Sequence, residues 1–347
     1  MSEQNTGKAE RIVLPDLLKG IAVVLMIQVH LTELFAVETW FNSMAGQISL
    51  FLGGPPAAPV FMVVMGYFIA RGNKNLTQNI KQGLKLILWG LLLNLGMNAH
   101  LLFEIATGQM QLNPWTYVFG VDILMLAGLS VLVIALFRWV FSDLIIPWIL
   151  LMLIIGFLNP YIPPYSGDSL WIPYLQAYFY GYHHWSYFPL FPWAAYPIAG
   201  YVFYLLEKKY QIQKMSERWM LFIAMGLLSI LVITFNFGFS RSILLSVYYH
   251  HDIIFLFWTL AFVVFFTLAI RMFLVENKNL FLNNWLQWIG KNVTSFYVFQ
   301  WLLIGNIATA IYRSQYFVQL LFWFIFITAA SSLMVWLWNK VKSKIRR

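Results

Sequence analysis

Long apolar stretches dominate this chain and restrict its fold more than any other feature. Ten segments are long enough to cross a bilayer core of roughly 30 Å as a helix, which needs about 20 apolar residues. Only 10% of the 347 residues are charged, too few to cover a water-soluble surface. We therefore predict an all-α polytopic integral membrane protein with about ten transmembrane helices. The expected spans are residues 13–36, 48–70, 83–103, 117–137, 143–159, 189–206, 219–237, 252–275, 293–312 and 316–339.

The positions of Lys and Arg orient these spans. Alternate connections hold 19 of the 22 Lys and Arg residues, the opposite connections hold only Arg241 and Arg313, and the first span holds Lys19. Because basic residues collect in cytoplasmic loops, both termini are predicted to be cytoplasmic. No repeat or soluble domain is visible, so we expect a single membrane domain over residues 1–347. Its extramembrane parts are a cytoplasmic tail at 1–12, an external loop at 160–188 and a basic cytoplasmic tail at 340–347.

The first span contains ionisable residues, which are costly in hydrocarbon and therefore mark a buried site or pathway. Lys19 and His30 are eleven positions apart, so at about 100° per residue they share one helix face, separated by about 16 Å. Asp16 lies three residues before Lys19, and Glu33 lies three residues after His30, so each can neighbour its partner on the same helix face. Two simpler interpretations stay open. Asp16 and Lys19 would form an interfacial ion pair, and His30 would be a helix-packing residue.

The predicted outer half of the protein holds most of the remaining polar groups. All six histidines fall there, which places polar chemistry near the outer face. Asp122 is expected at about the depth of His30, with a polar packing contact as its alternative role. The residues concerned are His30, His100, His183, His184, His250 and His251, together with Glu33, Glu104, Asp122, Arg241 and Asp252.

The segment Leu14–His30, LPDLLKGIAVVLMIQVH, contains a basic residue, ten others and a histidine. It resembles the first helix of the transmembrane acyltransferase superfamily, which includes acyltransferase-3 and heparan-α-glucosaminide N-acetyltransferase-like proteins. The motif FPLFPW points most toward the N-acetyltransferase-like branch. Further similarity lies in APVFMVVMGYFIARG (58–72), VDILMLAGLS (121–130), FPLFPWAAYPIAGY (188–201) and WIGKNVTSFYVFQWLL (288–303).

This resemblance implies acyl transfer across a membrane, from cytoplasmic acyl-CoA to a hydroxyl or amine of an external sugar or glycan. Acetyl-CoA is the expected co-substrate, and the transfer would be O- or N-directed. The expected location is the bacterial inner (plasma) membrane. The implied partners are acyl-CoA, the acceptor and the lipid bilayer, without nucleic acid, and a homo-oligomer is left open. The chain has no cysteine, which excludes an acyl group carried on a thiolate and favours direct transfer.

The resemblance also assigns residues. His30 would be the general base, oriented by Glu33 or Asp122, since an imidazole titrates near about 6.5 and suits proton transfer at working pH. Two departures are visible: lysine stands at position 19 where arginine is usual, and Gln300 stands where some relatives have histidine. The cations expected to hold the phosphates of acyl-CoA are Lys19, Arg71, Lys74, Lys81 and Lys85, with ordinary positive-inside charge as the alternative.

The external stretch 160–188 is rich in Trp and Tyr and has no Lys or Arg. Aromatic faces of this kind suit a sugar site, although Trp and Tyr are also enriched at membrane interfaces. We do not expect a metal, because the doublets at 183–184 and 250–251 lack helical ligand spacing and an acidic third ligand. The candidate acceptor-binding residues are Trp171, Tyr182, His183, His184 and Trp185.

Two rival functions fit some of these features. A transporter or flippase would use His30, Glu33 and Asp122 as a proton relay. The Gly53-Gly-Pro-Pro56 sequence would interrupt the second span and line a reaction chamber, as a transport pathway also requires, with the start of the second helix as its alternative role. The absence of internal symmetry counts against a transporter or flippase. The membrane-bound O-acyltransferase class ranks third, because its histidine lies late in the chain.

Overall fold

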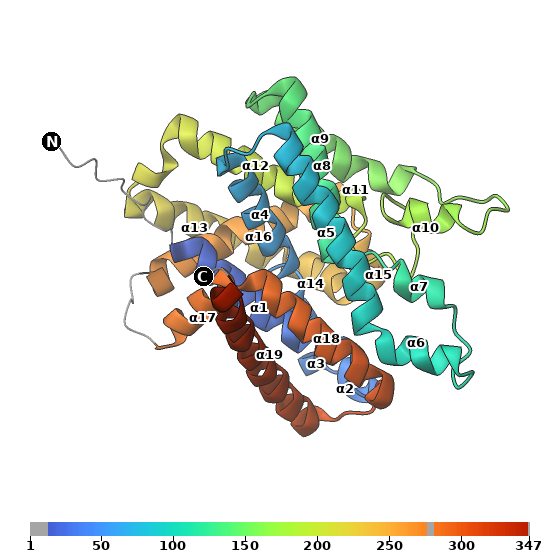
Figure 1. Cartoon of the computed structure of the whole chain (residues 1–347). Coiled ribbons are helices and arrows are strands. Elements are labelled where there is room, and N and C mark those ends of the chain that lie inside the picture. Colours follow the sequence, from blue (N-terminus) through green and yellow to red (C-terminus); the bar gives the residue numbers. More distant parts are fainter. Residues whose placement is uncertain (1–12, 276–280, 346–347) are drawn as a thin grey trace.

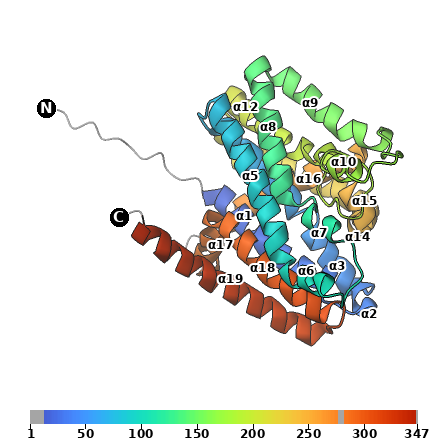
Figure 2. The ribbon, with the colours of Figure 1, turned by 45° about the vertical axis from the view of Figure 1, so that its right-hand side comes forward.

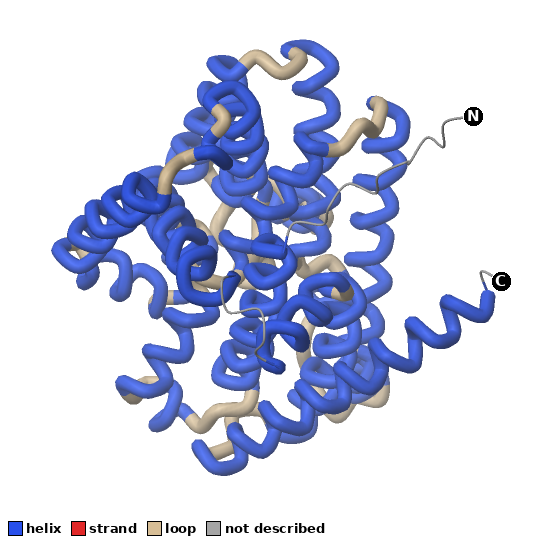
Figure 3. The backbone as a smooth tube through the Cα atoms, turned by 90° about the vertical axis from the view of Figure 1, so that its left-hand side faces the viewer, coloured by secondary structure: helices blue, strands red, loops and turns tan. Residues whose placement is uncertain are grey.

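The computed structural model describes residues 13–275 and 281–345, and within these ranges the chain is helical without any strand (Figures 1 and 3). The predicted all-α class is confirmed. Isolated bridges join Ala36 to Gln315 and Val121 to Ser186. The predicted tail at 1–12 and the last two residues of the tail at 340–347 lie outside the described residues.

The helices are mostly apolar and of very different lengths. Short 3-10 turns follow α9 and α12, and a π-helical turn extends α16. In chain order the helices are α1 (Val13–Leu34), α2 (Glu38–Phe41), α3 (Met44–Gly53), α4 (Ala58–Arg71), α5 (Leu76–Met97), α6 (Ala99–Ala106), α7 (Pro114–Val118), α8 (Ile123–Phe141), α9 (Ile145–Leu158), α10 (Ile172–Ala177), α11 (Leu190–Trp193), α12 (Ala195–Tyr210), α13 (Glu217–Ile233), α14 (Phe235–Ile243), α15 (Leu245–Tyr249), α16 (Ile253–Ile270), α17 (Phe281–Lys291), α18 (Val293–Ile311) and α19 (Phe317–Ile345).

Six helical segments in the described part are long and apolar enough to cross a bilayer, and two bent pairs raise that number to eight. The bends are 59° between α5 and α6 and 68° between α13 and α14. Predicted span 143–159 corresponds to the shorter helix α9, and span 189–206 to α11 and α12. The chain is thus a polytopic membrane protein, while the count of ten spans and the cytoplasmic termini stay predictions. The expected break at Gly53-Gly-Pro-Pro56 is confirmed, since α3 ends at Gly53 and α4 begins at Ala58.

Helix α1 lies at the centre of the bundle, where it packs against α3, α4, α16, α17, α18 and α19 (Figure 1). Two glycines permit its closest contact: a Cβ at Gly20 would overlap the Leu286 carbonyl, and a Cβ at Gly290 would overlap that of Asp16. Small residues at such crossings let helix backbones approach closely inside membranes. The polar residues of α1 are therefore enclosed by protein, and Asp16 is only 3% exposed.

A second group of helices packs beside α1. Helix α12 crosses α4 through Gly66 and Gly200, each of which faces the backbone of the other helix. It also contacts α9, where the rings of Trp148 and Tyr201 stack 3.9 Å apart. Helices α5 and α8 run side by side (Figure 2). This packing fixes the start of α8, where Asp122 lies, relative to α1.

The segment 185–188 hydrogen-bonds to the start of α8. The Val121 N–H donates to the Trp185 carbonyl at 2.9 Å, and the N–H groups of Tyr187 and Phe188 donate to the Val121 carbonyl at 3.2 and 3.0 Å. The Ser186 hydroxyl donates to the Ala177 carbonyl at the end of α10. These bonds hold the predicted external loop against the helix bundle.

Candidate functional site

A cavity of about 510 Å³ lies between α1, α8, α15, α18 and the 185–188 segment. Aliphatic side chains such as Met26 and Val29 form part of its wall. The rest of the wall is polar and aromatic. A mostly apolar wall with a few polar groups is typical of small-molecule sites. The polar and aromatic wall residues include His30, Glu33, Asp122, His184, Trp185, Tyr187, Tyr249, Tyr297 and Trp301.

His30 and Glu33 lie next to each other in the wall of this cavity. They are helical neighbours, and the Glu33 carboxylate lies 3.5 Å from His30 Nδ1, with the two side chains 12% and 16% exposed. At that distance the contact is electrostatic, because His30 Nδ1 makes no hydrogen bond. The ring of Trp301 lies 4.2 Å from the His30 ring, centre to centre. The side chains of Glu33 and Trp301 thus flank the His30 imidazole.

Tyr249 approaches Glu33 from the end of α15. Its hydroxyl donates to Glu33 Oε1 across 3.5 Å, at the limit of a hydrogen bond. Each carboxylate oxygen thus faces a different partner, His30 on one side and Tyr249 on the other. This arrangement restricts rotation of the carboxylate and keeps it beside the imidazole.

Asp122 also lines the cavity, but its oxygens have other partners. Oδ1 caps α8 by accepting the Met125 N–H at 2.9 Å, and Oδ2 accepts the Tyr297 hydroxyl at 3.2 Å. Since both oxygens are engaged, Glu33 is the carboxylate that contacts His30. Of the two predicted carboxylates, Glu33 is therefore the one that lies next to His30, and its role as the orienting group stays a prediction.

The predicted donor-binding cations lie on α1, at the end of α4, in the loop after it and on α5. Lys19 pairs with Asp16 at 2.9 Å and lies 5.4 Å from the ring centre of Phe68. Phe68 is on α4, one turn before Arg71 at the end of that helix. Lys74 follows in the loop and bonds to Gln82. Lys81 and Lys85 are exposed on the first turns of α5. None of the five predicted cations lines the cavity.

The predicted acceptor residues divide into two groups. His184 and Trp185 line the cavity, whereas Trp171, Tyr182 and His183 do not. The Tyr182 ring packs on His250 at 4.8 Å between centres. His183 Nε2 lies 3.2 Å from Gln176 Oε1, and burial, followed by the neighbouring His184, lowers the pKa of His183 below its usual value.

The doublet His250-His251 lies behind the wall that carries Tyr249. His251 Nδ1 donates to the Tyr248 carbonyl at 2.7 Å, and Nε2 accepts the Tyr196 hydroxyl at 3.0 Å, so the neutral ring satisfies both partners. Burial lowers the pKa of each of the two histidines to about 4. In the described part of the chain, His, Asp and Glu side chains do not gather in threes as a metal site requires.

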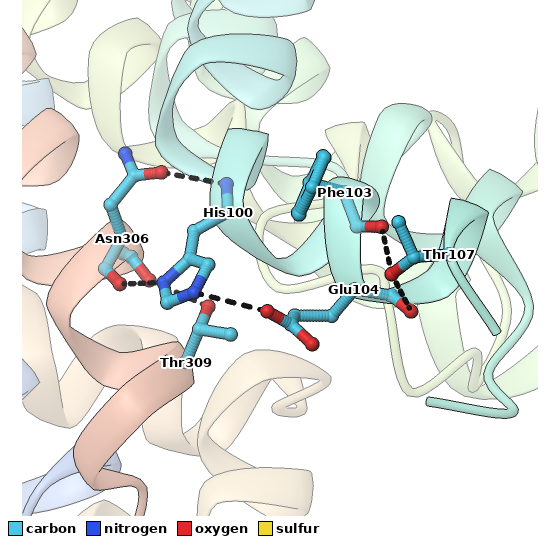
Figure 4. Close-up of polar contacts among 7 residues, drawn as sticks. His100, Phe103, Glu104, Thr107, Asn306 and Thr309 are labelled. Atoms are coloured by element: carbon cyan, nitrogen blue, oxygen red, sulfur yellow. Dashed lines mark hydrogen bonds and ion pairs between the residues drawn. The ribbon is translucent and has the colours of Figure 1, made fainter. Parts of the chain in front are cut away.

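Asn306 on α18 holds the bend between α5 and α6, which forms another wall of the cavity (Figure 4). Its side-chain amide donates to the Gly96 carbonyl at 2.9 Å, and its Oδ1 accepts the His100 N–H at 2.9 Å. The His100 ring faces the Asn306 carbonyl and lies 3.4 Å from Glu104. One side chain thus bonds to both sides of the bend.

Sequence reasoning missed several cavity residues, among them Tyr249, Tyr297 and Trp301. Tyr297 and Trp301 are spaced i, i+4 on α18, so they share one face, and this spacing is visible in the sequence. Tyr249 directly precedes the histidine doublet, but nothing in its local sequence indicates a contact with α1.

The comparisons with known proteins give one match. A family model described as an acyltransferase domain, acyltransferase-3, matches residues 12–338. Searches of curated proteins and of solved structures give no significant match. The expected closeness to the N-acetyltransferase-like branch stays a prediction. Because the family match spans nearly the whole chain, including every residue of the cavity, the protein belongs to the acyltransferase-3 family.

Proposed function

We propose that this protein transfers an acyl group, with acetyl as the expected group, from cytoplasmic acyl-CoA to a hydroxyl or amine of an external sugar or glycan. The observation that supports this most is the His30–Glu33 pair in a cavity of about 510 Å³, within a chain whose family is acyltransferase-3. A base backed by a carboxylate is the arrangement that acyl transfer to a hydroxyl requires.

In the proposed reaction, His30 takes the proton from the acceptor hydroxyl or amine as that atom attacks the thioester carbonyl. The carbon–oxygen or carbon–nitrogen bond forms, the carbon–sulfur bond breaks, and the imidazolium returns the proton to the departing thiolate. Glu33 stabilises the imidazolium through the 3.5 Å contact, and this contact is expected to shorten as charge develops. Tyr249 holds Glu33 in place.

The donor would extend along α1 from Lys19 to the cavity. His30 and Lys19 are about 16 Å apart along the helix, a length of the same order as a pantetheine arm. Because Asp16 already neutralises Lys19, the phosphates would depend more on Arg71 and on the exposed Lys74, Lys81 and Lys85. Met26, Val29 and other aliphatic wall residues suit the acyl group.

The test is an acyl-transfer assay with the purified full-length chain in lipid nanodiscs. Radiolabelled acetyl-CoA is supplied with a panel of sugars, and labelled product and free CoA are measured for wild type and His30→Ala. We expect His30→Ala to abolish transfer while retaining CoA binding. Equal product from both proteins would reject His30 as the base, and wild type that neither transfers nor hydrolyses acetyl-CoA would reject the donor.

A further inference from the structure

Five aromatic side chains form a connected row that leads from the protein surface to the cavity. The row consists of Trp115, Phe119, Trp171, Tyr174 and Trp185, and we call it the aromatic row. Ring centres are 5.4 Å apart for Trp115 and Trp171, 5.7 Å for Phe119 and Tyr174, and 5.2 Å for Tyr174 and Trp185. These separations are typical of packed aromatic pairs.

The row begins with exposed side chains and ends at the cavity. Trp171 and Trp115 are 56% and 45% exposed, whereas Trp185 is partly buried and lines the cavity, with the His184 ring 4.8 Å away. Its members come from the region of α7, from the start of α10 and from the 185–188 segment. Helix α7 also contributes Thr116 and Tyr117 to the cavity wall, so the row and the cavity share an element.

The middle of the row is held in a fixed position. Asn113 Nδ2 donates to the Tyr174 hydroxyl at 2.7 Å, which anchors that ring between Phe119 and Trp185. The Trp185 backbone is fixed in turn by its bond to Val121. The row therefore presents preorganised ring surfaces, which lose little entropy when a ligand binds.

The charges near the row restrict what it can bind. The two stretches that supply the row, 113–119 and 160–188, contain no Lys or Arg, and their one charged residue is Asp168. A phosphorylated or carboxylated ligand would find no cation there to pair with. Uncharged pyranose rings, whose C–H faces pack on aromatic rings, match this surface in shape and charge.

We infer that the aromatic row binds sugar units beyond the one that is acylated, so that the acceptor is an uncharged oligosaccharide or glycan and not a monosaccharide. This inference rests on the proposed function and extends its acceptor site outward from Trp185. Trp171 and Trp115 bind the outer units, and Trp185 and His184 contact the unit that enters the cavity. Trp171, predicted as an acceptor residue, would then act at a distance from the reacting atoms.

Calorimetric binding to the full-length chain in nanodiscs tests the inference without any acyl donor. The probes are monosaccharides and hexasaccharides of three neutral series, derived from chitin, starch and laminarin. We expect the hexasaccharide of at least one series to bind about tenfold more tightly than its monosaccharide. In that series Trp171→Ala and Trp115→Ala weaken hexasaccharide binding by about threefold to tenfold and leave monosaccharide binding within about twofold.

The matched control is Trp139→Ala on α8, a 71% exposed tryptophan outside the row. We expect it to bind like wild type. Equal affinity for monosaccharide and hexasaccharide in all three series overturns the inference. So does equal binding by Trp171→Ala and Trp139→Ala, which identifies the row as interfacial aromatics facing lipid. If either of these results is found while wild type still transfers acetyl to a monosaccharide, the inference fails and the proposed function stands. If binding depends on oligosaccharide length but wild type transfers no acetyl group, the proposed enzymatic function fails and the inferred sugar binding stands.

Discussion

Tyr249 and Glu33 are 216 positions apart in the sequence, yet the tyrosine hydroxyl lies 3.5 Å from the Glu33 carboxylate. Through Glu33 the contact reaches His30, the proposed base. We therefore expect Tyr249 to position the pair and not to react itself. Its contribution should therefore be found in turnover and not in substrate affinity.

Tyr249→Phe is expected to lower kcat about threefold to tenfold with KM nearly unchanged, because the Glu33 carboxylate loses one of its two restraints. Steady-state kinetics with acetyl-CoA measure the split. Tyr248→Phe is the matched control, since the Tyr248 hydroxyl makes no hydrogen bond. A change confined to KM in Tyr249→Phe would show that the tyrosine binds substrate instead.

Glu33 and Asp122 should separate into catalytic support and structural support. We expect Glu33→Gln to lower kcat by about tenfold to a hundredfold with little change in Tm, because it removes the charge beside His30. Asp122→Ala should instead lower the free energy of unfolding by about 1–2 kcal/mol through loss of the α8 cap. Asp122→Asn retains a capping side chain and is its control. The measurements are steady-state kinetics and thermal melting of the three variants. A loss of stability in Glu33→Gln and a loss of turnover alone in Asp122→Ala would contradict this assignment.

Donor affinity should depend on the cations between α4 and α5, which are Arg71 at the end of α4 and Lys74 in the loop after it. Arg71→Ala and Lys74→Ala are each expected to raise KM for acetyl-CoA about threefold to tenfold, since each removes a positive charge available to phosphate. Lys214→Ala, in the turn after α12, removes a charge from a loop predicted to lie on the same side and serves as control. If all three variants shift KM equally, the effect is one of general surface charge and not of a binding site.

Acid should destabilise the protein through His250 and His251. Burial lowers the pKa of both to about 4, against about 6.5 in an unfolded chain, so the unfolded state takes up protons that the folded state excludes. Their neutral forms are fully compatible with folding above pH about 6.5, and stability is lost as pH falls from there toward about 4. Thermal melting across this range should show a smaller slope for His250→Gln than for wild type. An unchanged slope would exclude His250 as a source of the effect.

The absence of cysteine allows a direct test of the predicted orientation. Single substitutions Asn73→Cys and Ser216→Cys lie in connections predicted to be cytoplasmic, and Gln109→Cys and Ser314→Cys in connections predicted to be external. A membrane-impermeant maleimide applied to intact cells should label only the second pair. Labelling of all four after permeabilisation is the control, and labelling of Ser216→Cys in intact cells would contradict the order of spans.

Much of the fold follows from the sequence because each bilayer crossing requires a long apolar segment, and most of the predicted spans coincide with the long helices described here. Bends were harder to predict. The break at Gly53-Gly-Pro-Pro56 has a local cause in proline and glycine. At the break between α5 and α6, hydrogen bonds on both sides instead come from Asn306, a residue far away in the sequence.

Contacts between candidate-site residues on the same helix could be predicted from the sequence. Contacts between residues on different helices could not. His30 and Glu33 follow from i, i+3 geometry on α1. The separation of Trp185, inside the cavity, from Tyr182, which packs on His250, depends on how the loop folds against Val121. Residue type alone predicted Trp185 and Tyr182 equally as acceptor-binding residues, because both are amphipathic aromatics in the same stretch.

The Asn306 amide has a broader consequence for how this chamber can be altered. One side chain, which does not itself line the cavity, bonds to both of the helical segments that meet there. Substitutions of Asn306 are therefore a place to begin reshaping the protein for bulkier compounds, because they leave the proposed His30–Glu33 pair in the sequence.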